Sequence, residues 1–275
     1  MKKRKNTNKN LAVAGVIEAL LLVGLVAIVI SIIQLQYIPT IMEQREADHM
    51  DQVSNQFSTL KSFIEMQSIT KATAPFSTML TLSSEPLPYF ITAGSTGTVS
   101  VDQLPGSYID IDNGAYQYDL TSIKYEASNV YFVEQSYILE GGGIIVKQPD
   151  GNAVMRVDPS IRIENGSTIK IFFDLPIFIG VAGKDITSGV GKCFIRTNWS
   201  EGDLEIFEGI GINFLNISTQ YPTAWYESLH TMLENNVNFE TGESYVRLSK
   251  KDGRPIFLYL KYYYIYVQIG IGWIK

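Results

Sequence analysis

The first pattern in the chain is a long apolar stretch near the N-terminus. Residues 11–33 read LAVAGVIEALLLVGLVAIVISII, and Glu18 is the only charged residue among them. A helix rises about 1.5 Å per residue, so a stretch of this length crosses the roughly 30 Å hydrocarbon layer of a membrane. Residues 32–36 are bulky and offer no small-x-small site for a signal peptidase. We therefore predict a retained transmembrane helix over residues 11–35.

A second apolar pattern, between residues 40 and 70, has the spacing of a helix. Its positions recur every three or four residues, at Ala47, Met50, Val53, Phe57, Leu60 and Ile64. Polar and charged residues lie between them, which predicts an amphipathic stem helix over residues 36–73. Pro39 is expected to kink this helix where it leaves the membrane. The apolar stripe has two interpretations: packing on the chain's own globular domain, or packing on the stems of neighbouring subunits.

From residue 74 onward the pattern changes to short runs of β type. Residues 36–93 contain no glycine, whereas residues 94–275 contain 20 of the 22 glycines in the chain. Runs rich in Val, Ile, Thr, Tyr and Phe, separated by glycine and proline, are typical of strands. The clearest runs are residues 98–102, 130–134, 143–147, 168–173, 211–217 and 255–269. We predict a mainly β exported domain over residues 74–275, folded as a sandwich or jelly-roll-like structure.

Two shorter signals refine this β-rich region. The pairs Asp150-Gly151 and Asp252-Gly253 favour the positive φ angles of tight turns and predict two hairpins. In residues 223–234 apolar side chains recur every four residues, which predicts one short helix against a face or an end of the sheet.

The basic residues are concentrated at the N-terminus. Five of the 22 lie in the first ten positions, whereas the chain beyond Ile33 holds 17 basic and 27 acidic residues. The positive-inside rule predicts that residues 1–10 are a cytoplasmic leader of a single-pass cell-membrane protein, with the bulk of the chain extracytoplasmic. An acidic body binds polyanions poorly, which argues against nucleic acid as a partner. Membrane lipid is the expected partner because of the predicted transmembrane helix.

Residues that carry catalysis or bind transition metals are sparse. The only histidines, His49 and His230, lie 181 positions apart, and Cys193 is the single cysteine. This distribution argues against a zinc site, and His230 is expected on the exposed face of its helix. The sequence contains no G-x-S-x-G nucleophile elbow. We therefore predict that the protein is not an enzyme and has no cofactor.

Acidic clusters are the remaining candidates for a metal site. One comprises Asp110, Asp112 and Asn113 ahead of Gly114, and the other comprises Glu201, Asp203, Glu205 and Glu208. Carboxylate oxygens suit calcium, but neither cluster has the D-x-[DN]-x-[DN]-G spacing. Alternating acids are also what the wet face of a strand presents, so calcium binding and a solvated surface both stay open.

Three N-x-[ST] sequons, at Asn165, Asn198 and Asn216, fall in the predicted exported region. Glycans on such sequons lie at the surface of exported proteins, which predicts a glycoprotein modified at these asparagines. Random placement of the asparagines gives about one or two sequons, so chance is the competing explanation.

The N-terminal segment combines several features in a fixed order. A basic leader precedes Ala14-Gly15, and the apolar stretch that follows carries the carboxylate of Glu18 a few positions in. This arrangement resembles the class III signal of type IV pilin-like proteins. The resemblance implies cleavage by a prepilin peptidase between Gly15 and Val16, and self-assembly through the N-terminal helix, with Glu18 paired to a neighbouring subunit's new amine. Glu18 is third after such a cut, where the family has its glutamate fifth; the alternative places Glu18 at the cytoplasmic interface.

Four further stretches extend over most of the chain: EADHMDQV at 46–53, TAGSTGTVS at 92–100, VEQSYILEGGGII at 133–145 and YPTAWY at 221–226. With the N-terminal segment, they resemble a family of archaeal envelope proteins of unknown function. The resemblance implies a location and an architecture but no reaction. We therefore expect a structural or interaction protein of the cell envelope, acting in surface assembly or adhesion. The alternative is a membrane-tethered binding module that recognises carbohydrate or depends on calcium.

Overall fold

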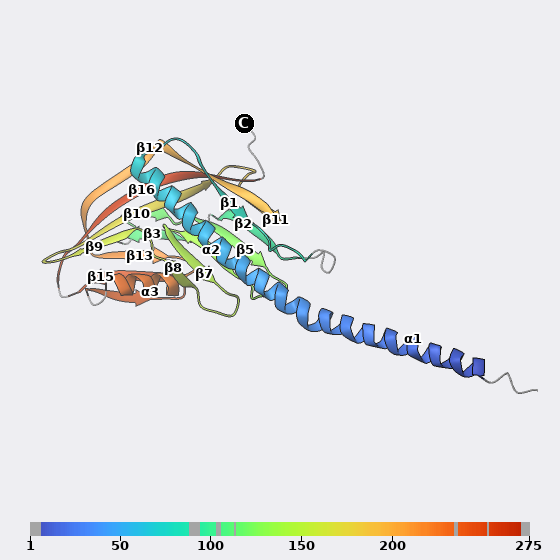
Figure 1. Cartoon of the computed structure of the whole chain (residues 1–275). Coiled ribbons are helices and arrows are strands. Elements are labelled where there is room, and N and C mark those ends of the chain that lie inside the picture. The colour runs from blue at the N-terminus through green and yellow to red at the C-terminus, as the bar shows by residue number, and fades with distance from the viewer. Residues whose placement is uncertain are drawn as a thin grey trace, which may run out of the picture.

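The computed structural model describes residues 7–87, 94–102, 106–112, 114–233, 236–251 and 253–270 and, apart from residues 7–12 and 200–207, their side chains. The chain begins with a long helical rod and continues as a mainly β domain. The first half of the rod projects from this domain, and the second half lies across it (Figure 1). The predicted order, an apolar N-terminal helix followed by a mainly β domain, is confirmed. A sandwich or jelly-roll topology stays a prediction.

The rod consists of three helical segments that follow one another without a break. They are α-helix α1 (Thr7–Ile32), π-helical turn η1 (Ile33–Tyr37) and α-helix α2 (Ile38–Thr70). From Val13 onward the rod includes a window that is long and apolar enough to cross a membrane, and none of this window is buried by the rest of the chain. The rod ends at Lys71, whose φ of 52° lies in the left-handed region that terminates helices.

The turn η1 lies just ahead of Pro39, the residue expected to kink the helix. The backbone N–H of Ile38 donates to the carbonyl of Ile33, five residues back, as in a π-helix. Pro39 has no N–H to donate to the carbonyl four residues earlier, so the helical hydrogen bonds rearrange in the preceding turn. Pro39 is therefore accommodated by a single π-helical turn where α1 joins α2, and the rod continues without a break.

The strands of the described residues form three sheets. In spatial order, the first sheet holds β1 (Phe76–Thr81), β12 (Lys192–Ile212), β16 (Ile256–Gly270), β10 (Ile169–Gly180) and β9 (Ile161–Asn165). The second sheet holds β11 (Ile186–Gly189), β2 (Thr96–Asp102), β5 (Ser122–Ser128), β6 (Ser136–Glu140), β7 (Gly143–Lys147) and β8 (Val154–Val157). The third sheet holds β14 (Val237–Thr241), β15 (Tyr245–Lys250), β13 (Phe214–Ser218), β3 (Tyr108–Ile111) and β4 (Tyr116–Asp119). These strands, with the helix α3 (Pro222–Leu233), are called the β domain below.

Long strands at the centre of the first sheet set the shape of the β domain. β10 and β16 pair in parallel, whereas β12 runs antiparallel to β16. The register of β12 on β16 shifts between Trp199 and Leu204 and again between Phe207 and Ile210. Such irregularities bend a strand and increase its twist. Both strands accordingly curve along the domain (Figure 1).

Two of the predicted strands are wrong in detail. Residues 130–134 form an irregular segment between β5 and β6. Here the Glu46 carboxylate on α2 accepts the backbone N–H groups of Val130, Tyr131 and Phe132, which a neighbouring strand would otherwise bind. The predicted run 211–217 is divided between the end of β12 and the start of β13.

The two Asp-Gly turns have different outcomes. Asp150-Gly151 joins β7 to its antiparallel neighbour β8, which confirms the first hairpin. The turn at Gly253, whose neighbour Asp252 lies outside the described residues, leads from β15 in the third sheet to β16 in the first. The second hairpin prediction is therefore wrong, because β16 pairs with β10 and β12 instead of returning along β15.

The apolar stripe of α2 is buried within the molecule's own core. Met50, Val53, Phe57, Leu60 and Ile64 are each at most 2% exposed and pack with residues of the first and second sheets. Each large apolar side chain that leaves water stabilises the fold by about 1.5–3 kcal/mol. Of the two interpretations of the stripe, the structure supports packing on the chain's own domain.

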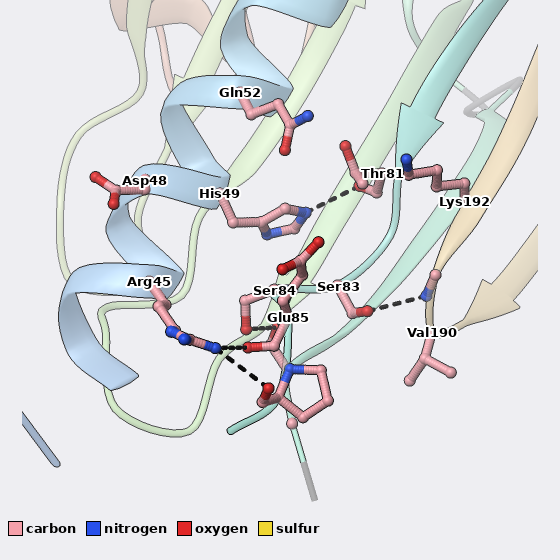
Figure 2. A pocket seen from close by; sticks show the side chains of 14 residues that line it. Arg45, Asp48, His49, Gln52, Thr81, Ser83, Ser84, Glu85, Val190 and Lys192 are labelled. Carbon is pink, nitrogen blue, oxygen red and sulfur yellow. Dashed lines mark hydrogen bonds between the residues drawn. The ribbon is translucent and has the colours of Figure 1, made fainter. Parts of the chain in front are cut away.

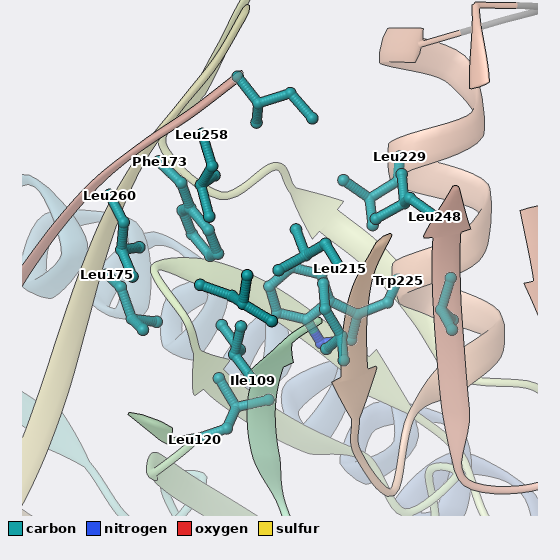
Figure 3. Packing of buried hydrophobic residues seen from close by; sticks show 14 of the residues in the cluster. Ile109, Leu120, Phe173, Leu175, Leu215, Trp225, Leu229, Leu248, Leu258 and Leu260 are labelled. Carbon is teal, nitrogen blue, oxygen red and sulfur yellow. The ribbon is translucent and has the colours of Figure 1, made fainter. Parts of the chain in front are cut away.

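A second core cluster is formed around α3, which confirms the short helix predicted near residues 223–234. Figure 3 shows Trp225 and Leu229 directed from α3 toward Phe173, Leu215 and their neighbours on the sheets. The rings of Trp225 and Phe173 meet edge to face, with centroids 6.4 Å apart. The helix lies beside β8, β14 and β15, and its apolar side chains pack in one cluster with residues of β10, β13 and β16.

Candidate functional site: a polar pocket beside helix α2

A pocket of about 670 Å³ lies between α2 and the segments that flank β1, β2 and β12. Its lining comes from residues 45–52 of α2 and from the segments 81–86, 94–95 and 190–192. Residues three and four apart on a helix share one face, which brings Arg45, His49 and Gln52 to the same wall (Figure 2). The volume lies within the roughly 300–1,000 Å³ typical of small-ligand sites.

His49 forms the inner part of that wall. It is 4% exposed, and its Nε2 lies 3.0 Å from the carbonyl oxygen of Thr81. Because a carbonyl oxygen only accepts, Nε2 carries the proton and Nδ1 is left as an acceptor. Nδ1 is buried without a hydrogen-bond partner among the described residues. In Figure 2 it faces the side of the pocket where Ser84 and Arg45 lie.

The surroundings of His49 keep its imidazole neutral. Burial lowers the pKa of His49, opposed in part by the hydrogen bond to the Thr81 carbonyl and by the charge of Glu46. The ring also meets Tyr125 edge-on, with centroids 6.4 Å apart. At neutral pH Nδ1 therefore presents a lone pair and no proton.

Arg45 connects the helix to the segment that follows β1. Its Nη1 donates hydrogen bonds to the carbonyl oxygens of Glu85 and Pro86, at 3.1 and 3.2 Å. Lys192 supplies a second positive charge to the lining, and Asp48 and Glu85 supply two negative charges. The two positive and two negative charges of these side chains therefore cancel.

Serine side chains complete the pocket wall on the side of the sheets. The Oγ of Ser95 accepts the backbone N–H of Ser84 at 2.8 Å and lies 2.9 Å from the Ser84 hydroxyl. The Oγ of Ser83 accepts the backbone N–H of Gly191 at 2.9 Å. The first two bonds join the segment after β1 to the segment before β2, and the third joins it to the segment before β12. Hydroxyl groups of these serines line the wall.

The sequence pattern does not indicate this pocket, because its residues come from segments far apart in the chain. One signal was available on α2. Glu46 and His49 are polar residues on the same face as Met50 and Val53, where a helix that only packs on a core carries apolar residues. Two buried polar residues on an apolar face indicate that each has a specific hydrogen-bonding role.

The predicted processing and assembly residues lie elsewhere, on α1. Gly15, Val16 and Glu18 are exposed, and a Cβ added at Gly15 meets no atom within 4 Å. The described structure brings none of the three together with another functional side chain. Their roles stay predictions.

The three sequon asparagines differ in accessibility. Asn165 in β9 and Asn198 in β12 are exposed, whereas Asn216 in β13 is only 6% exposed. The Nδ2 of Asn216, the atom that would carry a glycan, donates to the Ser218 hydroxyl at 3.3 Å. Glycosylation stays a prediction at all three, and accessibility favours Asn165 and Asn198.

The first acidic cluster supports backbone turns. The Oδ1 of Asp110 accepts the backbone N–H of Gly114 at 2.5 Å, and Asp112 accepts the N–H groups at the start of β13. Asn113 lies outside the described residues, as do the side chains of residues 201–207 in the second cluster. Within the described residues, no group of three or more His, Cys, Asp or Glu side chains is placed to hold a metal ion.

The remaining histidine and the cysteine are not among the residues that line the pocket. His230 is exposed on α3, as predicted, and its ring packs beside those of Tyr226 and Phe239. Cys193 is buried in β12, and burial raises the pKa of its thiol to about 12, so the thiol is protonated and inert at neutral pH.

Comparison with protein-family models, with curated proteins and with solved structures finds no match for this chain. What the molecule itself offers is a polar pocket with hydroxyl, amide and imidazole groups and with charges of both signs. Such a lining is suited to hydrogen-bonding a polar ligand.

Proposed function

We propose that this protein is a structural or interaction protein of the cell envelope. In this proposal α1 anchors it in the cell membrane in a single pass, with the N-terminus cytoplasmic and the β domain outside. One observation carries the proposal: a single continuous rod is apolar and exposed along its first half, whereas its second half is part of the core of the β domain.

The exposed half of the rod needs a non-aqueous environment. Between residues 13 and 32 its large apolar side chains are 47–70% exposed. Apolar surface of this extent is unfavourable in water and favourable in lipid. The basic leader at residues 1–10 supports a cytoplasmic N-terminus.

The buried half of the rod supports a pilin-like role. Because α2 is packed into the β domain, contacts that α1 makes in the membrane are transmitted to the domain through a continuous helix. Self-assembly through α1 would then array the β domains at fixed positions outside the membrane, for surface assembly or adhesion. The resemblance to type IV pilin-like proteins assigns processing to Gly15 and Val16, and assembly to Glu18.

Anchoring and orientation are tested with the full chain in membranes. We expect the protein to stay in the membrane pellet after alkaline carbonate washing and to be released by detergent. Protease added to the outside of spheroplasts should degrade the β domain and spare an epitope tag on the leader. Release by carbonate would refute the anchor, and a protected β domain would refute the orientation.

The pilin-like part is tested separately by the mass of the mature N-terminus. Processing predicts a first residue at Val16, whereas an intact Met1 terminus leaves a plain anchor. If Glu18 acts in assembly, Glu18→Gln should reduce cross-linked oligomers in the membrane. Glu43→Gln, at an exposed glutamate of α2, is the matched control and should leave them unchanged.

A further inference from the structure

The pocket beside α2 contains polar groups that the fold does not use. His49 Nδ1 is buried and lacks a partner within the described part of the chain, and its side chain is 4% exposed. In the same part of the chain, the side chains of Asp48, Gln52 and Lys192 line the pocket and form no intramolecular hydrogen bond or ion pair. An unpartnered buried acceptor is destabilising, so its position beside a cavity indicates that a donor comes to it from outside the chain.

The chemistry of the lining favours one class of donor. Two positive and two negative side chains balance, which gives neither a free phosphate nor a free cation a net electrostatic advantage. The acceptor Nδ1 requires an O–H or N–H donor. The amide of Gln52 and the serine hydroxyls both donate and accept, so they match groups that also do both.

We propose that this pocket binds the hydroxyl groups of a neutral sugar, with one hydroxyl donating to Nδ1 of His49. Sugar hydroxyls donate and accept at closely spaced positions, as the lining requires. Pro86 and Val190 supply apolar surface against which the C–H face of a sugar ring can pack. Of the carbohydrate and calcium alternatives that the sequence left open, these residues support carbohydrate.

The sugar has two sources that share this chemistry, a soluble or polymeric glycan and a glycolipid headgroup. The second source rests on the proposed membrane anchor. Measured along the rod, Arg45 lies twelve residues beyond Ile33, about 18 Å above the end of the apolar stretch at 1.5 Å per residue. Headgroups extend only about 5–8 Å beyond the hydrocarbon layer, so a glycan reaches this height and a bare phosphate headgroup does not.

The test uses the full chain in nanodiscs of phosphatidylglycerol. Methyl glycosides of glucose, galactose, mannose and N-acetylglucosamine are titrated separately by saturation-transfer NMR, and inorganic phosphate is the anionic probe. We expect at least one glycoside to bind and phosphate neither to bind nor to compete. Failure of all four glycosides to bind the folded protein would overturn the proposal, as would displacement of the sugar by phosphate.

Variants assign the binding to the pocket. His49→Gln keeps a donor for the Thr81 carbonyl and removes the Nδ1 acceptor, so we expect at least tenfold weaker sugar binding. Gln52→Ala changes an exposed side chain, leaves the fold intact and should weaken binding at least threefold. Glu43→Gln is the control and should leave affinity unchanged. If both pocket variants bind as the unaltered protein does, the sugar binds elsewhere and the proposal is wrong.

A second arm distinguishes the two sources. Nanodiscs that contain a monoglycosyl diacylglycerol are compared with nanodiscs of phosphatidylglycerol alone. If the glycolipid reaches the pocket, it competes with the soluble glycoside; if it does not, the soluble glycan is the ligand. The titration with soluble glycosides does not depend on anchoring in cells, so failure of sugar binding and failure of the membrane proposal are separate results.

Discussion

Oε2 of Glu46 on α2 accepts the backbone N–H of Tyr131 at 2.7 Å, although the two residues lie 85 positions apart. The same carboxylate accepts the N–H groups of Val130 and Phe132, at 3.1 and 2.7 Å. Glu46 is fully buried. Hydrogen bonds to an ionised acceptor are stronger than neutral ones. One side chain of the rod therefore holds the connection between β5 and β6 against α2.

Removing this carboxylate should destabilise the protein. In Glu46→Ala three backbone N–H groups lose a charged acceptor, and we expect the free energy of unfolding to fall by on the order of 3 kcal/mol. Urea denaturation of the full chain in detergent, followed by tryptophan fluorescence, measures it. Glu43→Ala, at an exposed position of the same helix, should change stability by about 0.5 kcal/mol or less. Equal effects of the two substitutions would contradict an anchoring role for Glu46.

The buried stripe of α2 makes the rod part of the β domain's core. Phe57 is fully buried and packs near Tyr137, with ring centroids 5.9 Å apart. We expect Phe57→Ala to lower the free energy of unfolding by about 3–5 kcal/mol through lost burial and a residual cavity.

Met66→Ala is the comparison for Phe57→Ala, because Met66 lies on the same helix and is 45% exposed. Its effect should be well below that of Phe57→Ala in the same denaturation assay. A small effect of Phe57→Ala would instead mean that α2 is a stem that separates easily from the sheets.

Gly97 in β2 lies where a side chain does not fit. An added Cβ would collide with the carbonyl oxygen of Leu82 and would lie 2.5 Å from a ring carbon of Tyr125. The Tyr125 hydroxyl donates to that same carbonyl at 3.0 Å, so neither neighbour moves freely. We expect Gly97→Ala to lower the free energy of unfolding by about 1–3 kcal/mol.

The control for Gly97→Ala is Gly151→Ala in the turn between β7 and β8. There the nearest atom to an added Cβ is Cβ of Gln148, at an ordinary contact distance of 3.6 Å. Thermal melts of the two variants should differ clearly. Similar melting temperatures would show that the β2 region relaxes around the added methyl group.

Glu140 at the end of β6 predicts a specific dependence of stability on pH. Burial raises the pKa of Glu140 from an ordinary 4.5 to about 7, opposed by hydrogen bonds from Thr219 and Trp225. Between these two values the folded state binds more protons than the unfolded state. The contribution of Glu140 to stability is therefore fully present below pH 4.5, and it is lost as pH rises toward 7, by roughly 3 kcal/mol.

Glu140→Gln isolates this contribution, because it keeps an acceptor for Thr219 and Trp225 and removes the titration. Denaturation at pH 5 and pH 8 should show the variant gaining stability relative to the unaltered protein as pH rises. In Glu227→Gln, at an exposed glutamate of α3, the free energy of unfolding should change with pH as it does in the unaltered protein. If the free energy of unfolding of Glu140→Gln shows the same pH dependence as that of the unaltered protein, Glu140 is ionised at little cost, contrary to its burial.

The pattern of apolar and polar residues predicted an element correctly where each face of that element has one kind of surroundings. The apolar stretch at residues 11–33 and the spacing of Val53, Phe57 and Leu60 identified the two halves of the rod, because helical periodicity is a property of neighbouring residues. Pattern failed where distant groups compete for backbone hydrogen bonds. Residues 130–134 have the composition of a strand, but Glu46 binds the N–H groups of the first three.

The candidate site was the least predictable part. His49 and Lys192 meet in one lining only because β1 pairs with β12 along one edge of the first sheet while α2 packs across it. Nothing in the residues around either position indicates such a meeting. The one visible sign, two polar residues on an apolar helix face, indicated buried hydrogen bonds and not their partners.

The sequence by itself determined an apolar segment long enough to span a membrane, a helical stripe after it and a β-rich remainder, since periodicity and composition act over a few residues. Only the tertiary structure decided that the stripe is core, that the turn at Gly253 joins two sheets, and that His49 lies beside a cavity with an acceptor that no described residue binds. Those outcomes depend on which distant segments bury surface and exchange hydrogen bonds together, and that choice is made by the whole fold.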